Sequence, residues 1–139
     1  MHNHLTIRAI RPEETYALRH SVLWPDKPLD YVKIAEDEHG FHFGAFWEER
    51  LVAVISLVLV GDEARFRKFA THPDFQRKGI GTQLLTRVFE EAQQRGARRI
   101  FCDARLEATG LYYKFGMAPN GPEFYKGPIP YVRMQKALL

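Results

Sequence analysis

The sequence contains one cysteine, Cys102, and no second cysteine that could pair with it. A disulfide within the chain is therefore excluded, and we predict a protein of the reducing cytoplasm. No stretch approaches the ~20 apolar residues of a membrane-spanning helix, because the longest apolar run is LVAVISLVLV at residues 51–60. No leader-like segment opens the chain, so we predict neither secretion nor a membrane partner.

The chain also lacks low-complexity tracts and a strong excess of one charge. Its 139 residues include 20 Lys and Arg against 17 Asp and Glu, which gives a formal net charge of +3. The basic residues are interspersed with acidic ones, and the modest clusters are Arg65-Arg67-Lys68, Arg77-Lys78 and Arg98-Arg99. This pattern favours a solvated mixed surface over a nucleic-acid stripe, although a local anion site stays open. The length fits one domain over residues 1–139.

The first half of the chain alternates strand-like and helix-like patterns. LTIRAI at residues 5–10 alternates apolar and polar residues and predicts a strand, and residues 11–23 carry apolar positions at helical spacing. A loop with a short helix follows at residues 29–37. Residues 41–71 then predict three strands, joined by tight turns at Glu48-Glu49-Arg50 and at Gly61-Asp62. These turns predict an antiparallel sheet.

The hydrophobic period changes at Gly79. Apolar residues recur every three or four positions from Ile80 to Ala92, and Gly96 ends this predicted helix. RRIFCDA at residues 98–104 predicts a strand parallel to its predecessor, since a helix connects the two. A short helix closing at Gly116 and a last strand at residues 130–138 complete an α+β fold. We expect a mixed, mostly antiparallel sheet of about six to seven strands flanked by about four helices.

The segment HPDFQRKGIGTQLL, residues 72–85, joins a predicted strand to the long helix. The first turn of a helix exposes unpaired N–H groups and a partial positive charge, so it accepts an anion readily. Glycines at 79 and 81 keep side chains away from that backbone. The pattern QxxGxG therefore predicts a pyrophosphate cradle, while a turn that needs glycine only for its geometry is the alternative. Neither a Walker loop nor the dinucleotide GxGxxG pattern is present.

RKFATHPDFQRKGIGTQLL resembles the cofactor motif of the GNAT superfamily of acyl-CoA-dependent N-acetyltransferases. The resemblance continues in IFCDARLEATGLYYKFGM, where LYYKFGM at residues 111–117 is similar to a family signature, and covers residues 65–139 in detail. It implies acetyl-CoA as acyl donor, an amine acceptor, no metal, and often a homodimer. The cofactor-binding residues that the resemblance implies are Phe69, Ala70, Thr71, Gln76, Arg77, Lys78, Gly79, Ile80, Gly81, Thr82 and Arg105.

The resemblance also implies a mechanism. A backbone N–H of Phe69 or Ala70, beside a splayed parallel strand pair, would polarise the thioester carbonyl. Tyr112 would protonate the departing thiolate, and its ordinary pKa of about 10 keeps it protonated at neutral pH. Many family members carry an Asn seven residues before this tyrosine, where the present sequence has Arg105. This departure leaves the corresponding cofactor contact open.

The general base is not evident from the sequence. Glu63, His72 and Asp103 are the nearby candidates, and we favour Asp103 because a carboxylate within an apolar strand must be paired or face the cleft. By analogy with the fold, Trp24, Tyr31 and Tyr125 are the candidates for binding the acceptor.

The sequence supports three hypotheses. The first is an acetyl-CoA-dependent N-acetyltransferase that acts on a primary amine of a small molecule or peptide. The second is a catalytically inactive, CoA-binding regulatory module. The third, a nucleic-acid-binding protein, is disfavoured by the cradle and the tyrosine signature.

Overall fold

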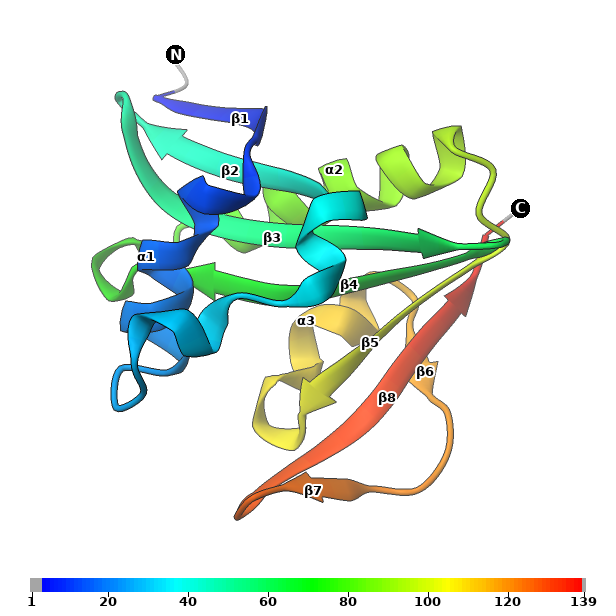
Figure 1. Cartoon of the computed structure of the whole chain (residues 1–139). Helices are drawn as coiled ribbons and strands as arrows, with labels where there is room; N and C mark the ends of the chain where they lie inside the picture. The colour runs from blue at the N-terminus through cyan, green and yellow to red at the C-terminus, as the bar shows by residue number, and fades with distance from the viewer. Residues whose placement is uncertain (1–3, 139) are drawn as a thin grey trace.

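Residues 4–138, which the computed structural model describes, build one sheet of eight strands (Figure 1). The strands are β1 (Leu5–Ile10), β2 (Phe41–Trp47), β3 (Arg50–Val60), β4 (Glu63–Thr71), β5 (Arg99–Arg105), β6 (Ala118–Pro119), β7 (Phe124–Lys126) and β8 (Ile129–Ala137). Their order is β1-β2-β3-β4-β5-β8-β6, with β7 paired to β8. Only β4 and β5 run parallel within this sheet, so the predicted mixed, mostly antiparallel sheet is confirmed. The sequence did not predict the short strands β6 and β7.

The two tight turns lie where the sequence places them. Glu48 and Glu49, between β2 and β3, both have positive φ angles of 48° and 75°. Two consecutive left-handed residues match the right-handed twist of a two-residue hairpin, which explains how two glutamates can connect these strands so closely. Gly61, with φ 61°, begins the turn between β3 and β4.

Two helices pack on one face of the sheet. Helix α2 (Ile80–Gln94) buries Ile80, Leu84, Leu85, Val88, Phe89 and Ala92 against the strands, which is the apolar stripe that its sequence predicts. Helix α3 (Thr109–Lys114) is followed by Phe115, whose ring lies 5.2 Å from the ring of Phe89. None of the helices within residues 4–138 is long and apolar enough to cross a membrane.

Short helical turns cover the opposite face, in front of β3 and β4 in Figure 1. They are η1 (Pro12–Thr15), α1 (Tyr16–Leu18), η2 (Arg19–Leu23), η3 (Leu29–Val32) and η4 (Ala35–His39). The helix predicted at residues 11–23 is thus a single α-helical turn that begins as a 3₁₀ turn and ends as a π turn. Leu18 packs here against Val54 and Ala70, which forms a second, smaller core.

A buried ion pair fastens these turns to the sheet. The fully buried Arg19 guanidinium donates to both carboxylate oxygens of Asp37 at 2.8 Å and to Ser56 Oγ at 2.9 Å. Ser56 Oγ lies 2.7 Å from Nδ1 of His42, whose Nε2 lies 2.9 Å from the carbonyl oxygen of Asp37. Burial alone would raise the pKa of Asp37, but the hydrogen bonds from Arg19 and from the N–H of Ile34 outweigh it and hold the pKa below its ordinary value.

We predict that Asp37→Asn lowers the free energy of unfolding by about 3–5 kcal/mol, because it leaves the Arg19 charge buried without a partner. Urea titration followed by tryptophan fluorescence measures this loss. The difference from wild type should be full above about pH 4 and shrink in stronger acid, where Asp37 itself becomes protonated. Asp30→Asn is the matched control, because its ion pair with Lys33 is exposed and should contribute little. Equal stability of the two variants would contradict this assignment.

Candidate functional site

The site begins where β4 and β5 separate. They pair in parallel at only three positions, Glu63 with Arg99, Ala64 with Ile100 and Arg65 with Phe101. Beyond Arg65, β4 stays paired with β3, while β5 continues with β8 as far as Arg105. The two strands therefore diverge toward the left of Figure 1. This divergence leaves two unpaired strand edges facing an opening, where an extended ligand can hydrogen-bond to the backbone.

A β-bulge lies in β4 beside this opening. Val54 pairs with Ala70 and Ser56 pairs with Arg67, so Lys68 and Phe69 together oppose the single residue Ile55. Lys68 has a left-handed φ of 57°. A bulge breaks the alternation of side chains and leaves an extra residue out of the strand ladder. As a consequence, the consecutive residues Arg67, Lys68 and Phe69 all line one pocket.

Two pockets flank the opening, and we name them after neighbouring elements. The α2 pocket has a volume of about 440 Å³, and the β5 pocket has a volume of about 490 Å³. The α2 pocket is lined by Val22, Phe69, Thr71, Phe75, Gln76, Arg77, Gly79, Ile80, Gly81, Thr82, Ala108, Leu111 and Tyr112. The two pockets share Val22, Phe69, Gln76, Ala108 and Tyr112, so they meet at these residues.

The backbone before α2 has the shape of an anion cradle. Arg77 and Gly79 adopt left-handed φ angles of 63° and 80°, and α2 begins at the next residue. Such turns direct successive N–H groups toward one concave space at the start of a helix. A Cβ atom at Gly81 would lie 3.2 Å from Cζ of Phe69. A side chain at this position would therefore crowd Phe69 and occupy part of the α2 pocket. The arrangement suits a pyrophosphate group.

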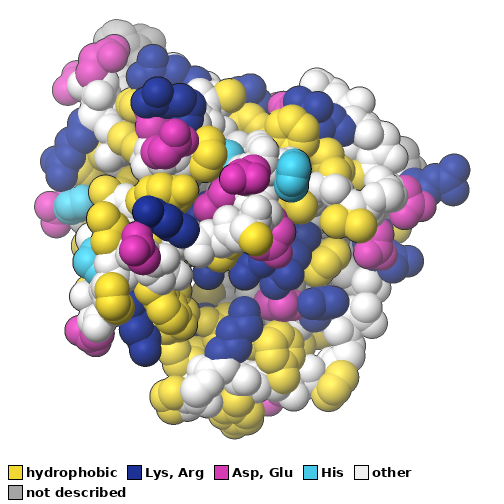
Figure 2. Space-filling model, in the orientation of Figure 1, with side chains coloured by type: hydrophobic (Ala, Val, Ile, Leu, Met, Phe, Trp, Pro, Cys, Tyr) yellow, Lys and Arg dark blue, Asp and Glu magenta, His cyan; other side chains and the backbone are white. Residues whose placement is uncertain are grey.

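The β5 pocket is rich in charged side chains. Figure 2 shows Lys and Arg side chains around the depression near the centre of this face. The pocket is lined by Val22, Leu23, Trp24, Arg65, Phe66, Arg67, Lys68, Phe69, Gln76, Cys102, Asp103, Ala104, Arg105, Glu107, Ala108, Tyr112, Lys126 and Tyr131. Within residues 4–138, no cluster of His, Cys, Asp and Glu could hold a metal ion.

Tyr112 lies at the junction of the two pockets. Helix α3 carries it, and its ring packs 5.6 Å from the ring of Phe66 on β4. Burial raises the pKa of the Tyr112 phenol above its ordinary value, and the neighbouring Cys102 adds to this effect. The phenol is therefore protonated at neutral pH and can donate a proton. Tyr113, the next residue, is exposed and lines neither pocket.

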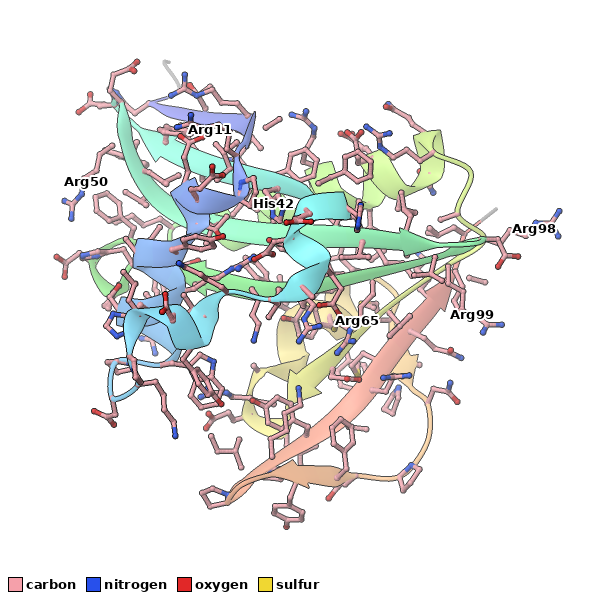
Figure 3. The ribbon with its side chains drawn as sticks, in the orientation of Figure 1. Arg11, His42, Arg50, Arg65, Arg98 and Arg99 are labelled. Carbon is pink, nitrogen blue, oxygen red and sulfur yellow. The ribbon has the colours of Figure 1, made fainter. Side chains whose placement is uncertain are left out.

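Asp103 is paired and also lines the β5 pocket. Arg65 donates to it at 3.0 Å from β4, and Arg133 donates at 2.8 Å and 3.2 Å from β8 (Figure 3 labels Arg65). Burial alone would raise the pKa of this carboxyl group, but the hydrogen bonds and charges of the two arginines outweigh it and lower the pKa. Asp103 is consequently ionised at neutral pH and a weak proton acceptor.

The other two base candidates have partners of their own. His72 accepts a hydrogen bond from the backbone N–H of Asp74 through Nδ1 at 3.1 Å, and so caps a short turn. Glu63 forms an ion pair with Arg99 at 2.8 Å, at the end of β4 where the strands are still paired. Cys102 is buried, and burial raises the pKa of its thiol to about 12, so it carries no reactive thiolate at neutral pH.

The structure brings most of the predicted residues to the two pockets. Ala70 is buried in the smaller core, and Lys78 is exposed beside the cradle, so neither lines a pocket. Trp24 lines the β5 pocket, and Tyr31 contacts it edge-on at 5.3 Å. Tyr125 is exposed on β7 and lines neither pocket.

Several lining residues were absent from the predicted set, among them Arg65, Arg67, Lys68 and Lys126. Arg65 and Arg67 are two residues apart on β4, so the sequence alone indicates that their side chains lie on the same face of the strand. The bulge that brings Lys68 to the same pocket has no recognisable pattern in the sequence, so the position of Lys68 could not be predicted.

The charged form of Lys68 is destabilised in this pocket. Desolvation lowers the pKa of Lys68 to about 8, with further lowering by the charges of Arg67, Arg19, Lys126 and Arg65. Among the described residues it forms no ion pair with a carboxylate. Its charge therefore costs stability in the folded protein.

We predict that Lys68→Met raises the free energy of unfolding at pH 7 by about 1 kcal/mol, less than the pKa shift alone would give because the side chain is partly exposed. The pKa of Lys68 is lower in the folded than in the unfolded chain, so the wild type gains stability as the pH rises from about 8 to 10.5. The advantage of Lys68→Met should therefore shrink over that range. Thermal unfolding at a series of pH values measures it, and a constant difference across the series would contradict the assignment.

Diverging parallel strands, a helix-start cradle and a half-buried tyrosine where two pockets meet match the features that the sequence motifs imply for an acyl-CoA-dependent transferase. The model described as "Acetyltransferase (GNAT) family" matches residues 7–117. The chain therefore belongs to the GNAT family of acetyltransferases, as its motifs predict.

Relatives and solved structures agree with this family. An uncharacterized N-acetyltransferase of Bacillus subtilis is 28% identical over 129 residues, which cover 86% of this chain and 87% of the relative. A ribosomal protein bS18-alanine N-acetyltransferase of Salmonella typhimurium is 33% identical over 72 residues, about half of each chain. A Lactobacillus plantarum structure assigned to the N-acetyltransferases superposes with a TM-score of 0.87, 24% identity and coverage of 99% and 100% of the two chains. An acetyl-CoA-bound GNAT structure from Elizabethkingia anophelis gives 0.76 at 18% identity, with coverage of 99% and 100%.

Proposed function

We propose that this protein transfers the acetyl group of acetyl-CoA to a primary amine of a small molecule or peptide by direct attack. The observation that carries the proposal is the position of Tyr112, at the junction of the α2 pocket and the β5 pocket. A donor in one pocket and an acceptor in the other would meet beside a protonated phenol. Relatives that acetylate an alanine of a ribosomal protein support an amine as the acceptor.

The α2 pocket is the proposed donor site. Backbone N–H groups from Arg77 to Thr82 would hold the pyrophosphate of acetyl-CoA, helped by the partial positive charge at the start of α2. The pantetheine arm would lie along the open edge of β4, at Phe69, Ala70 and Thr71, where β5 has already diverged. Arg105 lines the β5 pocket and would contact the arm from the other strand.

The reaction joins the amine nitrogen to the thioester carbon and breaks the carbon–sulfur bond. A backbone N–H of Phe69 or Ala70, beside the bulge, would stabilise the charge on the carbonyl oxygen. Tyr112 would give its phenolic proton to the departing sulfur and recover a proton from solvent. The amine loses one proton during the attack, so the overall proton count balances.

Asp103 has a different role in this proposal from the base suggested by the sequence alone. Because Arg65 and Arg133 lower its pKa, Asp103 would hold these arginines in position and take little part in proton removal. The proton of the amine would leave to water in the β5 pocket.

Release of free thiol from acetyl-CoA, measured with a panel of amines, tests the proposal, and mass spectrometry of the products identifies the acetylated amine. We expect thiol release that depends on the amine and a mass increase of one acetyl group. Tight binding of CoA without an acetylated product from any amine would instead favour the CoA-binding regulatory module.

We predict that Tyr112→Phe lowers kcat by about 10²-fold or more, as expected for loss of a general acid, with little change in the KM for acetyl-CoA. The ring and its packing against Phe66 are retained, so the melting temperature should stay unchanged. Tyr113→Phe is the matched control, because Tyr113 is exposed and lines neither pocket. Unchanged turnover in Tyr112→Phe would remove the tyrosine from the mechanism.

A second variant tests the donor site. We predict that Gly81→Val raises the KM for acetyl-CoA by about 10-fold, since the added side chain enters the α2 pocket beside the ring of Phe69. The KM for the acceptor should change little. Calorimetric titration with CoA provides an independent measure, and wild-type affinity would exclude the α2 pocket as the CoA site.

A further inference from the structure

The β5 pocket has an excess of positive charge next to the proposed reaction centre. Five cationic side chains and two carboxylates are among the residues that line it, namely Arg65, Arg67, Lys68, Arg105 and Lys126 against Asp103 and Glu107. The cations come from β4, from the end of β5 and from the β7–β8 hairpin, which are separate parts of the sequence. The fold thus gathers on one pocket several positive charges that are scattered along the chain.

Acidic partners compensate only part of this charge. Asp103 is already shared between Arg65 and Arg133, and Glu36 on η4 binds Arg67 at 3.1 Å. Within residues 4–138, no ion pair to a carboxylate involves Lys68, Lys126 or Arg105. The Arg65 Nε atom is also buried without a hydrogen-bond partner.

The positive charges of the pocket act on one another. Desolvation lowers the pKa values of Arg67, Lys68 and Lys126, and for each of them the charge of Arg65 lowers the pKa further, although Glu36 opposes this for Arg67 and Asp103 opposes it for Lys126. These lowered pKa values mean that the charged forms of the three side chains are destabilised in the pocket without a ligand. An anion in the pocket would relieve this cost through charge-assisted hydrogen bonds.

We propose that the acceptor of this acetyltransferase is an amine that also carries an anionic group, a carboxylate or a phosphate, which the cations of the β5 pocket bind. The inference rests on the proposed function, since it places the acceptor in that pocket. The anionic group would lie between Lys68 and Lys126, and the amine would point toward Tyr112. Amino acids and phosphorylated amines have this chemistry, whereas polyamines and lysine-rich peptides would be repelled.

The same charges assist the reaction. An amine attacks the thioester only in its neutral form, and neighbouring positive charges favour loss of its proton. The anionic group of the acceptor supplies binding energy, and the remaining positive field lowers the pKa of its ammonium group. This effect would allow attack without a dedicated carboxylate base, in agreement with the low basicity of Asp103.

Matched acceptor pairs test the proposal by thiol release: an amino acid against its carboxamide, and phosphoethanolamine against ethanolamine, with spermidine as the cationic comparison. We expect kcat/KM to be at least about 10-fold higher for the anionic member of at least one pair, and the pair that responds distinguishes carboxylate from phosphate. Neutral or cationic acceptors that react as well as the anionic ones would overturn the proposal.

Lys126→Met removes one of these charges and should reduce that preference by about 3-fold or more, because the KM of the anionic acceptor should rise more than the KM of the neutral acceptor. Arg98→Met is the matched control, because Arg98 directly precedes β5 and does not line the pocket; Figure 3 shows it at the right edge of the molecule, where β4 and β5 are still paired. An increase confined to the KM for acetyl-CoA in Lys126→Met would show that the cluster holds phosphates of CoA, and would also overturn the proposal.

Binding measurements separate this inference from the proposed function. If no amine is acetylated, the proposed function fails, and calorimetric titration of the same compounds into the protein saturated with CoA decides the inference. Tighter binding of the anionic members, weakened in Lys126→Met, would sustain an anion-binding acceptor pocket. Equal or absent binding of all members would refute it.

Discussion

The separation of β4 from β5 is the constraint on which the rest of the site depends. Three parallel pairs hold the strands together at one end, and beyond Arg65 each strand keeps only its outer neighbour. Parallel strands joined through a helix would normally continue side by side. Here β4 carries a bulge at Lys68 just beyond its last pair with β5, and β5 continues in pairing with β8 as far as Arg105. The result is an opening with the backbone of one strand on each side, and Tyr112 lies where the two pockets of this opening meet.

The two pockets that meet at this opening use different chemistry to attract negative charge. In the α2 pocket, left-handed residues at Arg77 and Gly79 and the start of a 15-residue helix expose the backbone itself. In the β5 pocket, long cationic side chains converge from elements distant in sequence. In the proposed function, the first arrangement would recognise a phosphate by close approach of the backbone, whereas the second would recognise charge and accept different anions. This division agrees with the two proposed sites, one for acetyl-CoA and one for an amine that carries an anionic group.

The sequence predicted the fold more completely than the site. Alternation in residues 5–10 and 41–71 and the apolar stripe of Ile80 to Ala92 are local patterns, so the strands and α2 could be read directly. The cradle and Tyr112 followed from a motif. The pocket charges could not be derived, because the neighbours of Lys68 and Lys126 are set by a bulge and by a hairpin whose strand β7 has three residues. The surroundings of Asp103 also depend on its cross-strand partner Arg133, which only the register of β5 on β8 establishes.

Two kinds of cation lie on the face that the short helical turns cover, and they differ in how their charge is balanced. Arg19 is fully buried, and both carboxylate oxygens of Asp37 accept its hydrogen bonds, so it holds η2, η4 and β3 in one arrangement. Even so, its positive charge still lowers the pKa values of Arg67 and Lys68. The charge of Arg19 is therefore balanced by Asp37, whereas the charge of the β5 pocket is balanced only in part. An acceptor with an anionic group, as proposed above, would supply the negative charge that Asp103 and Glu36 do not provide to Lys68 and Lys126.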